Sequence, residues 1–326
     1  MSLIQEKEEV PEDHKLQPNE SMASLPFDFC LSVMAYVRTT PHYNTERNLI
    51  KFGGVWEAAS ESLQRNMQIY SVTIRPCWYS QDWDYSFNNS AAIEMPTIEE
   101  LLKRKANIVG VWRICLRLPE DHDKNRPFYK ISPEFLESTL IPFVVARLVR
   151  ASRTQFRSTL KNQKKSEFVF KALTKLMQNV ELFTSFYMRS CGRASEEFFA
   201  TQADSPHLGK LFLYGRWSSA MHVPFATWLS NCNDYSGGYV DIKLNQSLLT
   251  LIVNKWFEKK ENQLVKFHIK CNEDIESLRH IRPDLQVQEK WEDNRETIVW
   301  KKGNVKFRVE KLTFRGRPQT ILCNWY

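Results

Sequence analysis

The chain has 326 residues, and its 45 lysines and arginines outnumber 38 acidic residues to give a formal net charge of +7. This length can bury a large core and favours one large domain or two ordinary ones. Only ten residues are glycine, which argues against a phosphate-binding enzyme with a glycine-rich loop. No stretch approaches the ~18 consecutive apolar residues of a membrane-spanning helix, so we expect no membrane partner.

The first residues are polar and acidic. Residues 1–23 contain almost no apolar run, a composition typical of disordered tails. No secretory leader is recognised, and the seven cysteines are scattered and odd in number. Reduced thiols in the cytoplasm or nucleus fit this cysteine usage best.

Two helices are predicted in residues 24–67, ahead of a longer α/β body. The first is a compact apolar helix over 25–37 that begins with Leu25-Pro26, and the second is amphipathic and covers 55–63. These helices are either a docking head for a partner or core helices that close one end of the body. The apolar pattern by itself leaves both interpretations open.

Residues 68–163 are predicted to form a mixed α/β linking region. β-branched and aromatic residues predict strands over 69–74 and 108–116. Thr97 and Glu100 have the spacing of a capping box, which predicts that a helix begins there.

A second helix of this region is predicted to begin at Ser132-Pro133, to kink at Pro142 and to run on toward Phe156. Basic residues recur every three or four positions from its end onward: Arg147, Arg150, Arg153, Arg157 and Lys161, followed by Lys164, Lys165, Lys171 and Lys175. On a helix the first five would form one positive stripe, able to bind a phosphate backbone or an acidic partner. We favour a solvated helix face, because no known nucleic-acid-binding motif accompanies the stripe.

Residues 164–326 are periodic. Short apolar strands recur every 25 to 29 residues, with a candidate helix in each gap; the strands are 182–187, 210–214, 239–244 and 264–269. The clearest helix, 247–258, has apolar residues at the spacing of one buried face. A repeated strand–helix unit is typical of an α/β solenoid. Because the repeats lack a regular leucine or asparagine ladder, we predict an irregular leucine-rich-repeat-like α/β solenoid.

Strand alternation predicts which side chains the solenoid presents on its concave face. Seven residues are expected there: Phe212, Tyr214, Tyr239, Asp241, Lys243, Lys266 and His268. Aromatic residues beside charges suit a protein-binding surface. The alternative is an ordinary sheet surface that neighbouring side chains cover.

The end of the sequence changes to period two between Ile298 and Val309, and Gly303-Asn304 supplies a turn. We predict a small antiparallel C-terminal cap, with 287–291 as its first strand. Such a cap would shield the last open edge of the solenoid.

No catalytic motif is recognised in the sequence. The seven histidines never pair at metal-ligand spacing, and the chain has no Cys-x-x-Cys, nucleophile elbow or kinase signature. The charged segment 120–123 is predicted to be a loop. We therefore expect no cofactor, no metal and no enzymatic activity.

The Leu-Pro helix start at 25–29 and the tryptophan- and alanine-bearing helix at 55–59 match the opening and continuation of an F-box. The stretches 205–217, 253–257 and 300–305 look like an F-box-associated region. Together, the head and the body resemble the large F-box protein families of nematodes. The resemblance covers about two thirds of the chain.

The resemblance implies a non-catalytic substrate adaptor. The F-box-like head would bind a Skp-type subunit of a cullin–RING ubiquitin ligase, and the body would bind an unknown protein substrate. Six head residues would be partly exposed until the Skp-type subunit covers them: Leu25, Pro26, Phe29, Val33, Trp56 and Leu63. The alternatives are a solenoid scaffold with a degenerate F-box and, after it, a basic nucleic-acid-associated protein.

Overall fold

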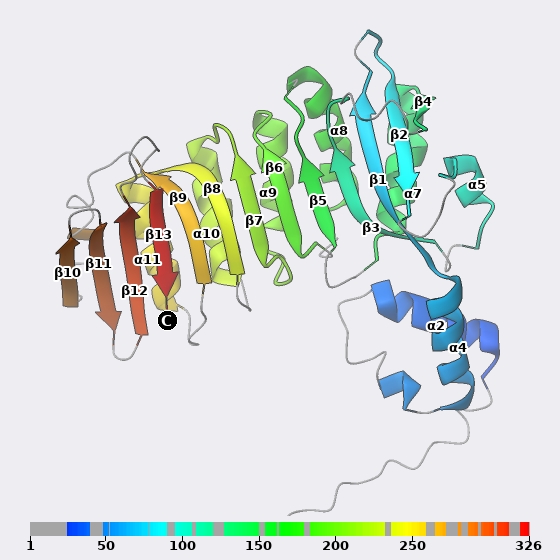
Figure 1. Cartoon of the computed structure of the whole chain (residues 1–326), viewed down its shortest axis with the longest axis horizontal. Helices are drawn as coiled ribbons and strands as arrows, with labels where there is room; N and C mark the ends of the chain where they lie inside the picture. Colours follow the sequence, from blue (N-terminus) through cyan, green and yellow to red (C-terminus); the bar gives the residue numbers. More distant parts are fainter. Residues whose placement is uncertain are drawn as a thin grey trace, which may run out of the picture.

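The computed structural model shows a small helical head at one end of a long sheet (Figure 1). The structure describes residues 25–39, 48–51, 53–77, 79–89, 95–105, 109–119, 127–149, 154–161, 163–178, 183–231, 236–258, 265–271, 280–281, 286–292, 295–302, 305–312 and 320–325. No helix in these ranges has both the length and the apolar character needed to cross a membrane.

A thirteen-stranded sheet forms the body, in the order β10-β11-β12-β13-β9-β8-β7-β6-β5-β3-β1-β2-β4. Its seven central strands are parallel. They are β1 (Gln68–Pro76), β3 (Val109–Leu116), β5 (Gln155–Ser158), β6 (Ser185–Arg189), β7 (Lys210–Tyr214), β8 (Ser236–Leu244) and β9 (Val265–Cys271). The predicted mixed α/β class with a large, mostly parallel sheet is confirmed.

Antiparallel strands extend the sheet at both ends. At one end lie β2 (Trp83–Asn88) and β4 (Tyr129–Ile131), and at the other lie β10 (Gln286–Glu292), β11 (Arg295–Lys302), β12 (Val305–Leu312) and β13 (Thr320–Trp325). The predicted meander is present as β10, β11 and β12, while its Gly303-Asn304 turn lies outside the described residues. The sequence did not predict β13, which pairs with β12 on one side and β9 on the other.

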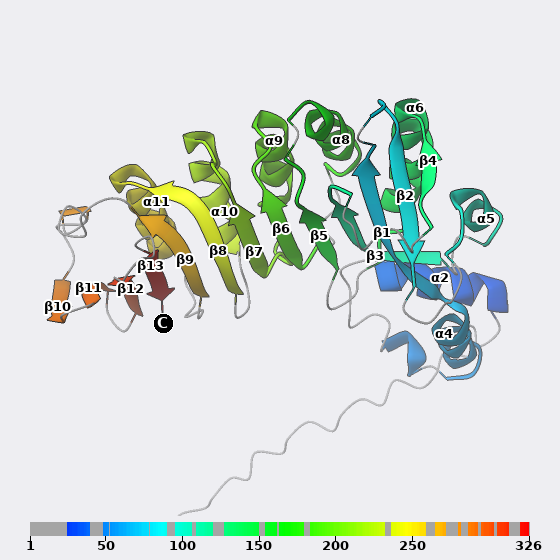
Figure 2. The same cartoon turned by 45° about the horizontal axis from the view of Figure 1, so that its top comes forward.

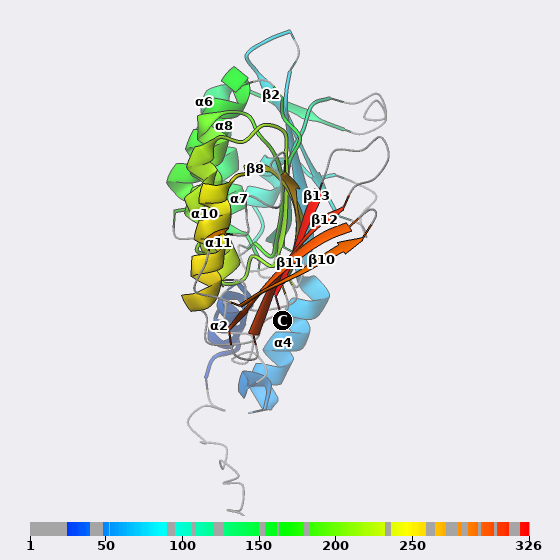
Figure 3. The same ribbon diagram turned by 90° about the vertical axis from the view of Figure 1, so that its left-hand side faces the viewer.

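Helices cover one face of the parallel strands. They are α8 (Gln163–Leu176), α9 (Arg193–Gln202), α10 (His222–Asn231) and α11 (Gln246–Glu258), which follow β5, β6, β7 and β8 in turn. Figure 2 shows these helices side by side along the sheet, and the edge-on view in Figure 3 places them all on the same side. Because successive strand–helix units return to the sheet with one hand, their helices gather on one face.

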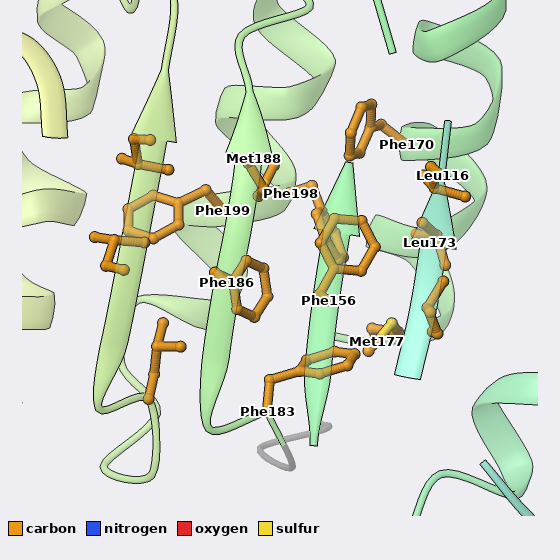
Figure 4. Packing of buried hydrophobic residues seen from close by; sticks show 14 of the residues in the cluster. Leu116, Phe156, Phe170, Leu173, Met177, Phe183, Phe186, Met188, Phe198 and Phe199 are labelled. Atoms are coloured by element: carbon orange, nitrogen blue, oxygen red, sulfur yellow. The ribbon is translucent and has the colours of Figure 1, made fainter. Parts of the chain in front are cut away.

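The core between helices and strands is centred on a cluster of phenylalanines (Figure 4). Phe156 of β5 is fully buried. Its ring centroid lies 4.8 Å from that of Phe198 on α9 and 5.2 Å from that of Phe186 on β6. The rings of Phe170 and Phe183 lie 6.2 and 5.9 Å away. Aromatic pairs at such distances add to the stabilisation that comes from burial alone.

The predicted helix toward Phe156 is wrong in its second half. It begins as α6 (Pro133–Phe135), passes through a π-helical turn over Leu136–Leu140, and continues as α7 (Ile141–Ala146). The π-turn ends two residues before Pro142, whose missing N–H and ring disturb the regular helical bonding. The helix ends at Arg147, and the next described helix or strand is β5.

The predicted basic helical stripe is therefore wrong as well. Arg147 ends α7, whereas Arg157 lies on β5, where burial alternates with a period of two. Spacings of three or four residues share a face only on a helix, so these two arginines do not form one helical stripe. Arg150 and Arg153 lie outside the described residues.

The head has its own small core. Helices α2 (Phe27–Thr39) and α4 (Gly54–Asn66) pack against each other through six buried residues: Cys30, Leu31, Met34, Trp56, Ala59 and Leu63. This cluster is separate from the core of the body. The two predicted helices are present, over 27–39 and 54–66 in place of the expected 25–37 and 55–63.

Tyr85 of β2 attaches α5 (Ile98–Leu102) to the sheet, since its phenol oxygen accepts a hydrogen bond from the backbone N–H of Ile98 at 2.9 Å. The predicted capping box of α5 is confirmed: Thr97 Oγ1 accepts from the Glu100 amide at 3.2 Å, and the Glu100 carboxylate accepts from the Thr97 amide at 2.9 Å. Burial is the main cause that raises the pKa of Tyr85 to about 12.

This shift predicts an alkaline dependence of stability. The pKa of Tyr85 is higher in the folded protein than the ordinary value of 10, so the folded state holds the proton more tightly. The stabilisation is complete below pH 10 and is lost as the pH rises to 12, by at most about 1.4 kcal/mol per pH unit. Urea unfolding across this range should show a smaller decline for Tyr85→Phe, and an equal decline would contradict the assignment.

Candidate functional site

The face of the parallel sheet opposite the helices is the candidate functional site. Within the ranges given above, no helix lies over this face (Figure 3). On β7, Leu211 and Leu213 are buried under the helices, whereas Lys210, Phe212 and Tyr214 point the other way. We define the open face as Arg113, Arg157, Tyr187, Arg189, Lys210, Phe212, Tyr214, Tyr239 and Asp241, all half-buried or exposed.

An uncovered parallel sheet is unusual. Parallel strands are commonly covered on both faces and then contain nearly continuous apolar runs. Here β7 alternates strictly, and in β5 and β6 the buried Phe156, Phe186 and Met188 alternate with the less buried Arg157, Tyr187 and Arg189, although Ser185 is also buried. The alternation leaves half-buried or exposed side chains on one face of these strands.

Aromatic pairs occupy the middle of the open face. The rings of Tyr187 and Phe212 are stacked with centroids 4.5 Å apart and planes 4° from parallel. Tyr214 and Tyr239 are stacked at 5.6 Å and 25°. Because Phe212 and Tyr239 are direct neighbours in the β7–β8 register, the two pairs form one continuous aromatic row.

Arginines lie beside this row. Arg157 is the register neighbour of Tyr187, and Arg189 is two residues further along β6 on the same face. Arg113 joins them through a bulge, because Tyr70 and Ser71 of β1 oppose Val111 and Arg113, which leaves Trp112 as the extra residue. A bulge of this kind changes the direction in which a side chain points, and the guanidinium carbon of Arg113 lies 4.1 Å from the centroid of the Trp112 ring.

The electrostatics of the open face are those of clustered positive charges. Burial lowers the pKa of Arg113, and the nearby positive charge of Arg157 contributes in the same direction. Burial also raises the pKa of Tyr239, with smaller contributions from Asp241 and Tyr214. Asp241 is bound locally, since its Oδ2 accepts a hydrogen bond from the Gly215 amide at 3.2 Å.

The structure places four of the seven predicted face residues on the open face. Phe212, Tyr214, Tyr239 and Asp241 lie there together, as the strand alternation predicted. The side chains of the other three lie outside the described residues: Lys243, Lys266 and His268. The backbone of β9 nevertheless pairs His268 with Tyr239.

The sequence patterns did not identify Arg113, Tyr187 and Arg189 as face residues, and they placed Arg157 on a helical stripe instead of a strand. The predicted repeats began at residue 182, so β3 and β5 were not recognised as neighbours of β6. The signal that could have identified β5 is the alternation in Gln155–Ser158, where Phe156 is buried and Arg157 exposed.

The head residues are only partly exposed in the way predicted. Pro26 and Phe29 are exposed, Phe29 by 51%, and Leu25 and Val33 are half-buried. The expected exposure of Trp56 and Leu63 is wrong, because they are 2% and 0% exposed and fill the core between α2 and α4. A pair of amphipathic helices must bury its largest apolar residues internally before it can present any to a partner.

A second candidate is a cavity of about 360 Å³ near the β1–β2 hairpin. It is lined by Arg75, Cys77, Tyr79, Ser80, Asp84, Pro119 and Lys130. Cys77 donates a hydrogen bond to Asp84 at 3.2 Å, and burial raises the pKa of its thiol. A thiol held in its protonated form is a poor nucleophile, so the cavity offers no activated cysteine.

Metal-ligand groups and comparisons with known proteins add no further site. In the part of the chain that the structure describes, no three histidine, cysteine or acidic side chains gather as a metal site would need. No protein-family model matches the sequence, and no curated protein or solved structure is significantly similar to it.

Proposed function

We propose that this chain is a non-catalytic adaptor that binds a Skp-type subunit of a cullin–RING ligase through its head and a protein substrate through its open face. The body would then be an irregular leucine-rich-repeat-like solenoid. Its parallel strands follow one another in chain order, and its helices gather on one face, which supports this proposal. The observation that carries it is the open face itself, where half-buried and exposed aromatic rings lie beside arginines as in protein-binding surfaces.

The head supports the first half of the proposal because it is a separate helical unit with apolar residues left outside. Phe29 and Val33 lie four residues apart on α2, and Pro26 immediately precedes the helix, so the three are spaced to lie along one side of its start. Their exposure or partial exposure leaves an apolar ridge on α2. A partner helix could bury this ridge without disturbing the buried residues beneath it.

Co-expression with a Skp-type subunit followed by size-exclusion chromatography tests this half. The full chain should co-elute with the subunit, and Phe29→Asp should abolish co-elution, since one central apolar anchor can contribute about 2 kcal/mol or more. Val223→Asp is the matched control, because Val223 is 64% exposed on α10 and lies away from the head.

Circular dichroism should show that both variants remain folded. Absence of co-elution for well-folded wild type would reject the ligase connection and favour a scaffold with a degenerate F-box. Equal co-elution of wild type and Phe29→Asp would instead mean that α2 does not provide the contact.

A further inference from the structure

We propose that the open face selects an extended, acidic segment of its protein substrate. Carboxylate or phosphate side chains of that segment pair with Arg113, Arg157 and Arg189, and its apolar residues contact the aromatic row from Tyr187 to Tyr239. This inference rests on the proposed function, since it names the chemistry of the substrate that the open face would bind.

The three arginines lie on a diagonal across neighbouring strands. Arg113 pairs with Gln155, two residues before Arg157 on β5. Arg157 pairs with Tyr187, two residues before Arg189 on β6. Each step therefore combines one strand spacing with two residues of strand rise, or about 8 Å in total.

That spacing suits an extended peptide. Side chains on one side of an extended chain repeat every two residues, or about 7 Å, and long arginine side chains can bridge the small difference. Acidic residues at alternate positions could thus meet successive arginines. The guanidinium group also favours carboxylate and phosphate because its N–H groups bind two oxygens at once.

Charge complementarity points to an anionic partner. The open face contains four basic residues, Arg113, Arg157, Arg189 and Lys210, and one described acidic residue, Asp241, which accepts a hydrogen bond from the Gly215 amide. Arg113 and Arg157 are close enough that the charge of one lowers the pKa of the other, and the buried Nε of Arg113 has no hydrogen-bond partner. A bound anion would offset the repulsion between these two guanidinium groups.

The aromatic geometry favours a peptide over a single-stranded nucleic acid. Proteins that stack bases on a sheet present the flat faces of aromatic rings to the nucleotide. In the Tyr187–Phe212 pair the rings on adjacent strands are parallel and 4.5 Å apart, so their inner faces already oppose each other. The edges point outward from the sheet, which suits apolar side chains and disfavours flat base stacking.

Selection of a random twelve-residue peptide library on the 326-residue chain tests the proposal. Enriched peptides should carry acidic residues at alternate positions next to an apolar or aromatic residue. Replacing both Arg157 and Arg189 by Gln should weaken the affinity for a selected peptide on the order of a hundredfold, about tenfold for each charged contact. The charge-matched control is the double substitution of Lys175 and Arg193 by Gln, because both residues are exposed and lie on helices of the opposite face.

Two further arms separate the sources of negative charge. A selected peptide is synthesised with phosphoserine in place of glutamate, and the tighter form identifies carboxylate or phosphate as the preferred group. A twenty-nucleotide single-stranded RNA is titrated in parallel, and tighter binding of RNA than of any peptide, lost with the arginine variant, would overturn the proposal in favour of a nucleic-acid partner.

The remaining outcomes show whether the acidic-segment proposal fails by itself or the proposed function fails with it. Neutral or basic peptides that need Phe212 and Tyr239 but not the arginines would overturn the acidic class and leave a protein-binding face. Failure to enrich any peptide would reject the open face as a peptide site, while the Skp-type co-elution experiment would still stand by itself.

Discussion

Replacing Phe156 by Ala should lower the free energy of unfolding by about 4 kcal/mol. The ring is fully buried where β5, β6, α8 and α9 meet, and four other phenylalanine rings lie with their centroids 4.8 to 6.2 Å from it (Figure 4). Truncation removes buried area and leaves a cavity among rings that the sheet and two helices hold in place. The surrounding side chains have little freedom to fill the cavity, so the lost buried area and the cavity should both lower the free energy of unfolding.

Urea unfolding followed by circular dichroism measures this effect. Phe156→Leu keeps most of the volume and should lose only about 1–1.5 kcal/mol, whereas Val223→Ala at an exposed position should change little. If Phe156→Ala lowered the free energy of unfolding no more than Phe156→Leu, the phenylalanine cluster would not be the centre of the core.

Replacing Gly238 by Ala should have a similarly large effect for a different reason. Gly238 faces Leu211 in the β7–β8 register, and a Cβ at this position would overlap the Leu211 carbonyl group, with its carbon only 2.9 Å away. The obstacle is backbone within a paired strand, so it cannot move without opening the ladder. We expect a loss of about 3 kcal/mol and a weakened open face, because Phe212 and Tyr239 flank this contact.

Gly209→Ala is the matched control, one residue before β7. Its Cβ would come no nearer than 4.0 Å to the Thr184 carbonyl oxygen, an ordinary contact. The substitution should be neutral or slightly stabilising, since alanine lowers the conformational entropy of the unfolded chain. Chemical denaturation of both variants compares them directly, and equal stability would show that β7 and β8 are not in the register given above.

Local patterns explain why much of the fold was predictable. The strand over 210–214 was predicted with its observed bounds, and the helix over 247–258 differs from α11 by one residue. Both rest on apolar periodicity and on residues that begin or end elements, which act within a few positions of the chain. The Thr97–Glu100 capping box was correct for the same reason.

The errors arose where distant residues decide the outcome. A four-residue strand such as β5 has too little sequence to distinguish itself from a helix continuation, and only its pairing with β3 and β6 defines it. The diagonal of arginines exists only once register is fixed, because no spacing along the chain connects Arg113 to Arg189. The burial of Trp56 was likewise decided by the packing of α2 against α4, which periodicity alone does not orient.

The position of β13 has a consequence for how the molecule assembles. β13 connects the three-stranded meander of β10, β11 and β12 to the parallel strands. It follows the meander in the sequence but lies between β12 and β9 in the sheet. The meander can therefore form locally as hairpins, yet its attachment must wait for a non-local pairing, which is intrinsically slow. We therefore expect native-state hydrogen exchange to distinguish two cooperative units. The hydrogen bonds between β9 and β13 would be the boundary between them, and the end of the sheet formed by β10–β13 would open there.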